Sequence, residues 1–166
     1  MYWSSLELPT GTAYAGATDS GICMLSLREE SDEAFVTSLM KRYRVVPERD
    51  DERFSRLSDE LAGYFDGTRR KFTVRLDVMG TGFQRRIWAE LLNVGYGEVR
   101  SYRELGEAAG SPKAAQAVGR AMGANPIPLI IPCHRIIASD GTLGGYAYGL
   151  EMKKRLLKLE RALTAP

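Results

Sequence analysis

The sequence predicts two domains: an α/β domain with a small antiparallel sheet over residues 1–80, and a mainly helical domain containing a helix-turn-helix over residues 81–166. Short β-rich runs between turn signals fill much of the first half. Apolar residues at helical spacing, often preceded by capping residues, fill the second. The length of 166 residues suits one large domain or two small ones.

The first elements form a predicted hairpin. The runs TAYAGAT (residues 12–18) and GICMLSL (residues 21–27) are rich in β-formers and flank the turn signal DSG. Cys23 lies in the apolar part of the second run, so we interpret it as a packing residue of the core.

Two helices follow. The segment SDEAFVTSLMKRY (residues 31–43) predicts a helix capped by Ser31 or Asp32. The segment FSRLSDELAGYFDG (residues 54–67) predicts a second helix that ends at Gly67. The first domain is then expected to close with a strand, RKFTVRLDV (residues 70–78), because its apolar and polar residues alternate.

Near residue 81 the predicted secondary structure changes from mixed strand and helix to mostly helix. Thr81 and Gln84 have the spacing of a capping box at the start of a helix. The apolar stripe predicted for this helix consists of Phe83, Ile87, Trp88, Leu91 and Leu92.

The next two segments have the outline of a helix-turn-helix. SYRELGEAAG begins with a second capping box, Ser101 to Glu104. SPKAAQAVGRAMGAN predicts a helix with Ser111 as N-cap, Pro112 in the first position and an end at Gly123. The second helix is rich in alanine and glycine, which suits tight packing against a neighbouring helix as well as close approach to a DNA groove.

The charge of the chain is divided unevenly. Residues 1–80 carry 11 Lys/Arg and 14 Asp/Glu, whereas residues 81–166 carry 12 and 7. The second half is therefore where a polyanion would bind, although a solvated basic face explains the same counts.

The last predicted helix lies in GLEMKKRLLKLERALTAP. Its apolar stripe is Met152, Leu156, Leu159 and Leu163. Glu160 lies at the edge of this stripe, where it could pair with Arg161 or Lys153 at the surface. It could instead face His134, the only histidine of the chain.

The stretch NPIPLIIPCHRII (residues 125–137) places Cys133 and His134 side by side. A thiol becomes a nucleophile as thiolate, and a histidine oriented by a carboxylate is a common activating group. Adjacent residues of a strand point to opposite faces, so the two side chains would meet only across a backbone bend or a bridging water. A buried, unreactive thiol is the alternative.

Composition limits the remaining possibilities. No apolar run approaches the roughly 20 residues of a membrane span, and the N-terminus lacks the pattern of a signal peptide. We therefore expect a cytoplasmic protein whose two cysteines are reduced. Two cysteines and one histidine make a structural zinc site improbable, and we expect no metal and no cofactor.

The segment IPCHRII, preceded by NP and followed by SDGTLGGYAYG, resembles the active-site region of the O6-alkylguanine-DNA alkyltransferases, or methylated-DNA–protein-cysteine methyltransferases. The resemblance extends through FQRRIW, YGEVRSYRELGEAAGSPKAA, AVG and LLKLE, and covers about residues 61 to 160. It implies an N-terminal domain resembling the RNase H fold and a C-terminal domain with a helix-turn-helix. The implied partner is double-stranded DNA containing O6-alkylguanine, bound through the minor groove by a monomer.

The resemblance also implies catalytic roles. Cys133 would accept the alkyl group from a guanine flipped out of the duplex, with O4-alkylthymine as a possible minor substrate. His134 would act as base through a water, and Glu160 would hold its tautomer. Tyr102 would donate a proton toward N3 of guanine, and Asn125 would brace the turn before the active-site segment.

Two larger sets of residues follow from the same resemblance. The walls of the guanine pocket would come from Met122, Pro128, Ile136, Tyr146, Ala147 and Tyr148. The residues expected to contact DNA are Ala114, Ala115, Gln116, Gly119, Arg120 and Arg135.

The sequence departs from the family pattern at several positions. Gln116 stands where the family usually has arginine, and we hypothesise that Arg120, one turn later, recovers part of the attraction to phosphate. Ala147 and Tyr148 replace common Ser and Gly, which predicts a reshaped pocket that disfavours benzyl relative to methyl groups. Gly95 replaces a frequent Pro, which loosens a turn.

Two other functions are weighed against alkyl transfer. A DNA-binding regulator would need the helix-turn-helix but not the whole set of chemical side chains. A thiol hydrolase usually takes its base from a distant part of the chain, whereas the only histidine here follows Cys133 directly.

Overall fold

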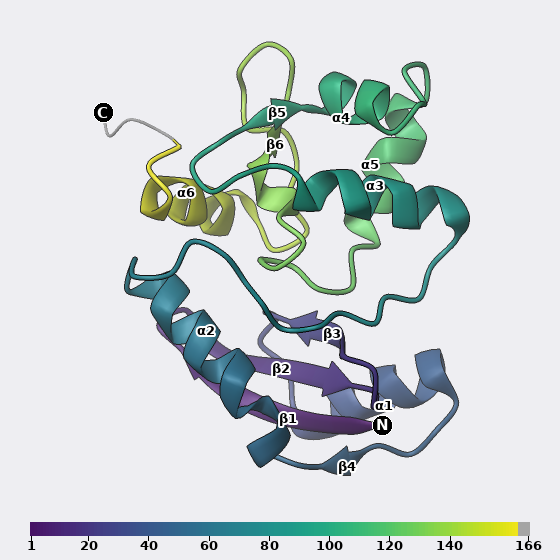
Figure 1. The fold of residues 1–166 in the computed structure, drawn as a ribbon, viewed down its shortest axis with the longest axis vertical. Coiled ribbons are helices and arrows are strands. Elements are labelled where there is room, and N and C mark those ends of the chain that lie inside the picture. Colours follow the sequence, from purple (N-terminus) through teal and green to yellow (C-terminus); the bar gives the residue numbers. More distant parts are fainter. Residues whose placement is uncertain (163–166) are drawn as a thin grey trace. The chain divides into compact units, whose positions relative to one another are not determined.

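The computed structural model describes residues 1–162, and the chain divides into two compact units, Met1–Met79 and Gly80–Pro166 (Figure 1). The first is an α/β unit and the second is mainly helical, as the sequence predicts. Leu163, expected in the stripe of the last helix, lies outside the described residues.

The sheet of the first unit has the strand order β3-β2-β1-β4. Its strands are β1 (Tyr2–Leu8), β2 (Gly11–Ala17), β3 (Ile22–Ser26) and the short β4 (Glu48–Arg49). The predicted hairpin of β2 and β3 is confirmed as an antiparallel pair. The sequence analysis did not predict β1, which pairs antiparallel with β2 and parallel with β4.

Both predicted helices of this unit are present. Helix α1 (Asp32–Tyr43) is capped by Ser31, whose side chain accepts a hydrogen bond from the Ala34 amide. Helix α2 (Ser55–Phe65) follows a short 3₁₀ turn, η1 (Glu52–Phe54), and lies on the other face of the sheet from α1 (Figure 1). The α1 side of the core is a cluster of buried apolar residues: Trp3, Tyr14, Phe35 and Leu39.

The expected strand over residues 70–78 is wrong. This segment makes a single bridge, between Leu76 and Ile22. The amides of Thr73 and Val74 donate to the Glu60 carboxylate instead, at 2.7 and 3.3 Å. Because a side chain takes these donors, the segment cannot extend the sheet beyond one bridge.

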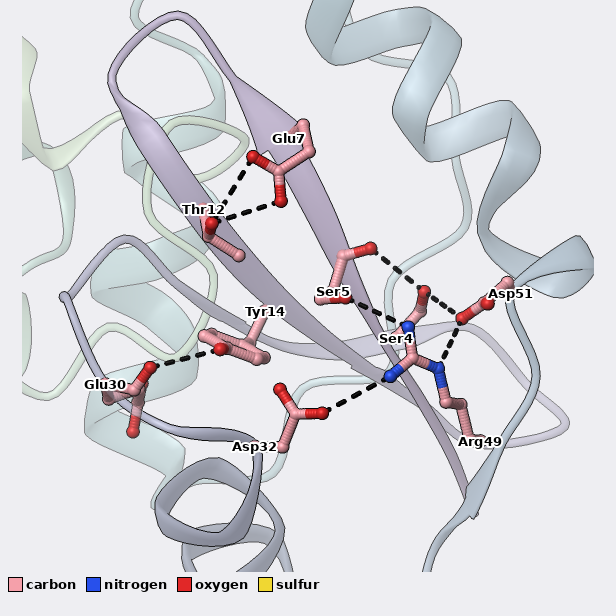
Figure 2. A network of polar contacts seen from close by, with 9 residues as sticks. All are labelled: Ser4, Ser5, Glu7, Thr12, Tyr14, Glu30, Asp32, Arg49 and Asp51. Carbon is pink, nitrogen blue, oxygen red and sulfur yellow. Dashed lines mark hydrogen bonds and ion pairs between the residues drawn. The ribbon is translucent and has the colours of Figure 1, made fainter.

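A polar network fixes β4 beside β1 (Figure 2). The Arg49 guanidinium donates to the Ser5 hydroxyl at 3.1 Å and to the carboxylates of Asp32 and Asp51 at 3.3 and 3.0 Å. It also lies over the Trp3 ring, 5.1 Å from the centroid. One cation therefore links the edge of the sheet to the start of α1.

The second unit contains four α-helices within the described residues: α3 (Gly82–Leu92), α4 (Tyr102–Ala108), α5 (Ala115–Gly123) and α6 (Leu150–Leu159). Strand β5 (Arg100–Ser101) pairs in parallel with β6 (Ile136–Ile137), and the 3₁₀ turn η2 (Cys133–Arg135) immediately precedes β6. Helices α4 and α5 pack on each other and on α3, which gives the predicted helix-turn-helix (Figure 1).

Both predicted capping boxes of this unit are confirmed, at Thr81 and at Ser101. Two details differ from expectation. Leu92 is half exposed rather than part of the buried stripe of α3. Helix α5 begins at Ala115, not at Pro112, because residues 111–114 form a separate turn closed by the Ala114 amide and the Ser111 carbonyl.

The stripe of α6 is only partly as predicted. Leu156 is buried, Met152 and Leu159 are half buried, and Leu157 and Lys153 complete the covered face. No helix formed by the described residues has the length and apolar composition of a membrane span.

Candidate active site

The site is centred on η2, where the backbone bends directly after Pro132. Cys133, His134 and Arg135 form one 3₁₀ turn, and their exposed fractions are 6%, 0% and 7%. The bend meets the condition under which adjacent Cys and His side chains can act together. Three consecutive polar or reactive side chains are thus buried. Burial of such a group costs free energy unless a hydrogen bond or an ion pair compensates for it, so each side chain calls for a partner or a role in the chemistry of the site.

Asn125 ties the turn after α5 to the cysteine. Its amide nitrogen donates to the Ile131 carbonyl at 2.8 Å and lies 3.2 Å from Cys133 Sγ. Its side-chain oxygen accepts from the Ile127 amide at 3.0 Å. Asn125 thus contacts Ile127, Ile131 and Cys133, and its amide places a donor beside the sulfur.

Glu160 is buried and faces His134, not the surface. His134 Nε2 lies 2.7 Å from Glu160 Oε1, and Arg135 donates to both carboxylate oxygens at 2.9 and 3.0 Å. Burial raises the pKa of Glu160, but the hydrogen bonds from His134 and Arg135 outweigh it and lower the pKa to about 2. Glu160 is thus a carboxylate at neutral pH.

The ionised Glu160 decides the tautomer of His134. A carboxylate can only accept, so Nε2 carries the hydrogen of this pair. Burial lowers the pKa of His134 more than Glu160 raises it, and the ring is neutral at pH 7. Nδ1 is therefore unprotonated, and it has no hydrogen-bond partner within residues 1–162. A buried, unpaired ring nitrogen is a suitable general base.

Cys133 rests as a thiol. Burial raises its pKa, while the Asn125 amide and the charge of Lys153 act in the opposite direction. A protonated thiol in this position needs a base to become a nucleophile. The neutral nitrogen of the adjacent His134 can supply one.

Arg135 does not fit the expected DNA contact. Besides its bonds to Glu160, its guanidinium donates to the Val94 carbonyl at 2.7 Å. The side chain is 8% exposed, so it serves as an internal counter-ion to Glu160 and cannot reach a groove.

Lys153 is a site residue that the sequence analysis missed. It is fully buried on α6, and its ammonium donates to the carbonyls of Ile136, Leu143 and Gly145. Burial lowers its pKa to about 8, whereas the three carbonyls favour the charged form. A signal was available, because Lys153 lies on the same helical face as Leu156, Leu157 and Glu160.

A cavity of about 220 Å³ opens onto the sulfur of Cys133. Its lining comes from α4, α5, η2 and the loop before α6: Tyr102, Gly119, Met122, Gly123, Cys133, Gly145, Tyr146 and Ala147. The expected pocket residues Met122, Tyr146 and Ala147 are among them. Pro128, Ile136 and Tyr148 are not, and Pro128 and Ile136 are buried elsewhere in the unit.

Two tyrosines give the cavity its polar groups. The Tyr102 hydroxyl lies 3.5 Å from the Gly145 carbonyl, and burial raises its pKa, so it is a proton donor at neutral pH. The buried Tyr146 hydroxyl has no partner in the described part of the chain, and its ring lies 5.6 Å from that of Tyr148. Within residues 1–162 no cluster of three or more His, Cys, Asp or Glu is arranged to hold a metal.

Helix α5 presents the expected small-residue surface. Ala115, Gln116 and Arg120 are exposed, Ala114 and Gly119 are half buried, and Gly119 also lines the cavity. A Cβ built on Gly119 would meet nothing within 4 Å, so this face is open to close approach.

Comparisons with known proteins agree with this geometry. Residues 1–78 match the family described as 6-O-methylguanine DNA methyltransferase, ribonuclease-like domain, and residues 82–162 match its DNA binding domain. The methylated-DNA–protein-cysteine methyltransferase of Mycobacterium tuberculosis is 49% identical over 162 residues, covering 98% of this chain and 93% of that protein. The inducible enzyme of Bacillus subtilis is 35% identical over 166 residues, covering 99% and 93%.

A solved structure extends the likeness to three dimensions. The crystal structure of Mycobacterium tuberculosis OGT in complex with DNA has a TM-score of 0.85 and 38% identity, over 98% of this chain and 94% of that one. The fold is therefore that of a ribonuclease-like domain followed by a helical DNA-binding domain. The chain belongs to the methylated-DNA–protein-cysteine methyltransferase family.

Proposed function

We propose that this protein repairs DNA by direct reversal, transferring the alkyl group from O6 of guanine to its own Cys133. The observation that carries the proposal is a buried thiol at a cavity of about 220 Å³, directly followed by a histidine whose unprotonated nitrogen has no hydrogen-bond partner among the described residues. Membership of the family supports the same reaction.

The chemistry follows from the site. His134 Nδ1 takes the thiol proton through a water, and the Glu160 carboxylate stabilises the imidazolium that forms. Cys133 Sγ then forms a bond to the alkyl carbon while the carbon–O6 bond breaks and its electron pair passes into the guanine. The Tyr102 hydroxyl donates a proton toward N3 and neutralises the leaving base. The products are unmodified guanine and a thioether.

Recognition of the lesion requires access to a base inside the duplex. We assign α5 to the minor groove, because its small residues permit close approach and wedge-like contacts. The alkylated guanine flips into the cavity beside Cys133, and O4-alkylthymine is a minor substrate. The protein acts as a monomer in the cytoplasm and needs no cofactor.

The decisive experiment is intact mass after incubation with a duplex containing one O6-methylguanine. We expect the wild type to gain one methyl group per molecule and Cys133→Ala to gain none. A second addition of substrate should add nothing, because the described site holds no group placed to cleave a thioether. Tight lesion binding without a mass gain would instead identify a recognition protein.

A further inference from the structure

A second concave surface lies within the first unit, formed by the turn between β2 and β3, the start of α2 and the segment before Leu76. Its volume is about 210 Å³. We call it the arginine cleft, because Arg53, Arg56 and Arg75 all line it. A volume of about 210 Å³ leaves room for a phosphate group, and the three arginines of the lining, not the size of the cleft, indicate which ligand it favours.

The three guanidinium groups are only partly engaged. Arg75 makes no ion pair with any described residue. Arg56 is 68% exposed at its side chain, where Nε reaches the Glu60 carboxylate at 3.4 Å and Nη2 donates to the Thr73 hydroxyl at 2.7 Å. Each of these two can therefore turn donors toward a bound anion.

Arg53 is held more firmly than the other two. Its guanidinium stacks on the Tyr2 ring, 3.6 Å from the centroid, and Nε donates to Asp50 at 3.3 Å. The carboxylate of Asp19, which lines the cleft, is 3.8 Å away and 83% exposed. Stacking fixes the plane of the guanidinium while leaving donors for a ligand.

The lining of the cleft is mainly positive, whereas residues 1–80 as a whole carry a net negative charge. Residues 1–80 carry three more acidic than basic residues, yet the cleft is lined by three arginines and one acid, Asp19. A local excess of arginine in an acidic unit concentrates attraction for an anion at one place. Arginine binds phosphate with paired donors, which makes phosphate the favoured ligand chemistry.

We propose that the arginine cleft binds one phosphate of the DNA backbone, as a contact separate from α5. This inference rests on the proposed function, since DNA held by the second unit is presented to the first at high effective concentration. The cleft contributes affinity without sequence preference, because phosphate contacts position a protein and do not read bases.

The test uses the full chain and a lesion-free duplex, with affinity measured by fluorescence anisotropy at several salt concentrations. The test variant combines Arg53→Gln, Arg56→Gln and Arg75→Gln. A matched control combines Lys41→Gln, Arg44→Gln and Lys71→Gln, which removes three exposed cations of the same unit outside the cleft lining. We expect the slope of log affinity against log salt to fall by about 1 in the test variant relative to this control.

The single substitution Arg75→Gln separates a loss of binding from a loss of folding, because Arg75 makes no ion pair in the folded unit. It should lower the affinity severalfold at low salt, and an affinity equal to that of Lys41→Gln would overturn the proposal. Equal slopes for the two triple variants would overturn it as well. Methyl transfer measured by mass should remain complete in all of them, so failure of the cleft leaves the repair function standing.

Inorganic phosphate distinguishes DNA from a free phosphate compound. Its addition should shift the amide resonances of Ser20 and Gly21 in the wild type but not in the triple cleft variant. If phosphate shifts these amides while the duplex slope is unchanged, the cleft serves a small phosphate ligand and the DNA proposal is wrong.

Discussion

The residues of the Cys133–Arg135 turn share nearly the same burial but differ in chemical state. Cys133 is a neutral thiol, His134 is a neutral base, and Arg135 is a cation neutralised by Glu160. Burial keeps Cys133 and His134 neutral, whereas the guanidinium of Arg135 is charged and pairs with the Glu160 carboxylate. A single carboxylate, Glu160, fixes the tautomer of His134 and neutralises the charge of Arg135.

Tyr102→Phe tests the proton donor. We expect the rate of methyl transfer to fall by about 10²-fold, since the phenol is the only group assigned to protonate the leaving base. The free energy of unfolding should change by less than about 1 kcal/mol, because the one hydrogen bond of this hydroxyl within residues 1–162 is a long one to Gly145. Single-turnover kinetics and urea denaturation measure the two effects, and an unchanged rate would remove Tyr102 from the mechanism.

Tyr148→Gly tests the reshaped pocket. The Tyr148 ring packs on Tyr146, which lines the cavity, so its removal should allow Tyr146 to move. We expect the rate on free O6-benzylguanine, relative to a methylated oligonucleotide, to rise roughly tenfold. Tyr148→Phe keeps the ring and should leave this ratio as in the wild type. If both variants behave alike, Tyr148 does not control the pocket.

At the scale of elements, α5 combines two requirements. Val118 and Ala121 are buried against the rest of the unit, while Ala115 and Gln116 are exposed. The small residues therefore allow tight packing on the buried face and close approach of a DNA groove on the exposed face. The two interpretations of this helix are compatible. Its late start at Ala115 leaves no side-chain cap, so its stability depends on packing against α3 and α4.

Arg120→Ala tests whether this exposed cation compensates for Gln116. We expect weaker binding of lesion-free duplex and a salt slope smaller by about 1, the value for one lost phosphate contact. Anisotropy titrations over a range of salt measure both quantities. An unchanged slope would mean that Arg120 does not contact phosphate.

Gly21→Ala tests the bridge between β3 and the segment before Leu76. A Cβ at Gly21 would lie 2.5 Å from the Arg75 carbonyl oxygen, which cannot retreat without breaking its bond to the Ile22 amide. We expect a loss of about 1–3 kcal/mol in the free energy of unfolding. Ser20→Ala in the same turn should cost much less, and equal losses would refute the steric explanation.

At the scale of the whole molecule, acid should weaken both units through buried carboxylates. Glu60 in the first unit and Glu160 in the second are each 2% exposed. Burial raises the pKa of Glu60, but hydrogen bonds from Thr73 and Val74 together with Arg69 bring it below its usual value. Both carboxylates therefore stabilise the folded state more when they are ionised than when they are protonated.

Acid unfolding can be assigned to Glu160 by comparison with Glu160→Gln. A folded pKa of about 2 against a usual 4.5 corresponds to about 3 kcal/mol. This stabilisation is present above pH 4.5 and is lost as the pH falls toward 2. We expect the variant to be less stable at pH 7 and to lose less stability on acidification. Urea denaturation at several pH values measures this, and parallel curves would contradict it.

Features that depend on residues close together in the sequence were predicted better than features that depend on contacts between distant segments. The capping boxes at Thr81 and Ser101 depend on residues three positions apart, and both are present. The expected strand over residues 70–78 failed because Glu60, on a preceding helix, takes its amide donors. Strand β1 was missed because its burial depends on strands and helices that the local pattern does not reveal.

The same contrast applies to the site. The pairing of Cys133 with His134 could be considered from their adjacency, whereas the position of Asn125 was expected only from the family resemblance. The burial of Arg135 could not be predicted, because cations are usually exposed and only the folded unit brings the Val94 carbonyl and Glu160 around it. For Lys153 the helical spacing gave a signal, but its carbonyl partners come from segments outside the helix.

The protonated state of Cys133 has a consequence for the lifetime of the unused protein. A molecule that can react only once is lost if it meets the wrong electrophile. Because Cys133 is 6% exposed and its pKa is raised, small alkylating agents and oxidants in solution encounter little thiolate. Reactivity is thus withheld until a substrate fills the cavity, and the cell can keep a reserve of intact acceptor molecules.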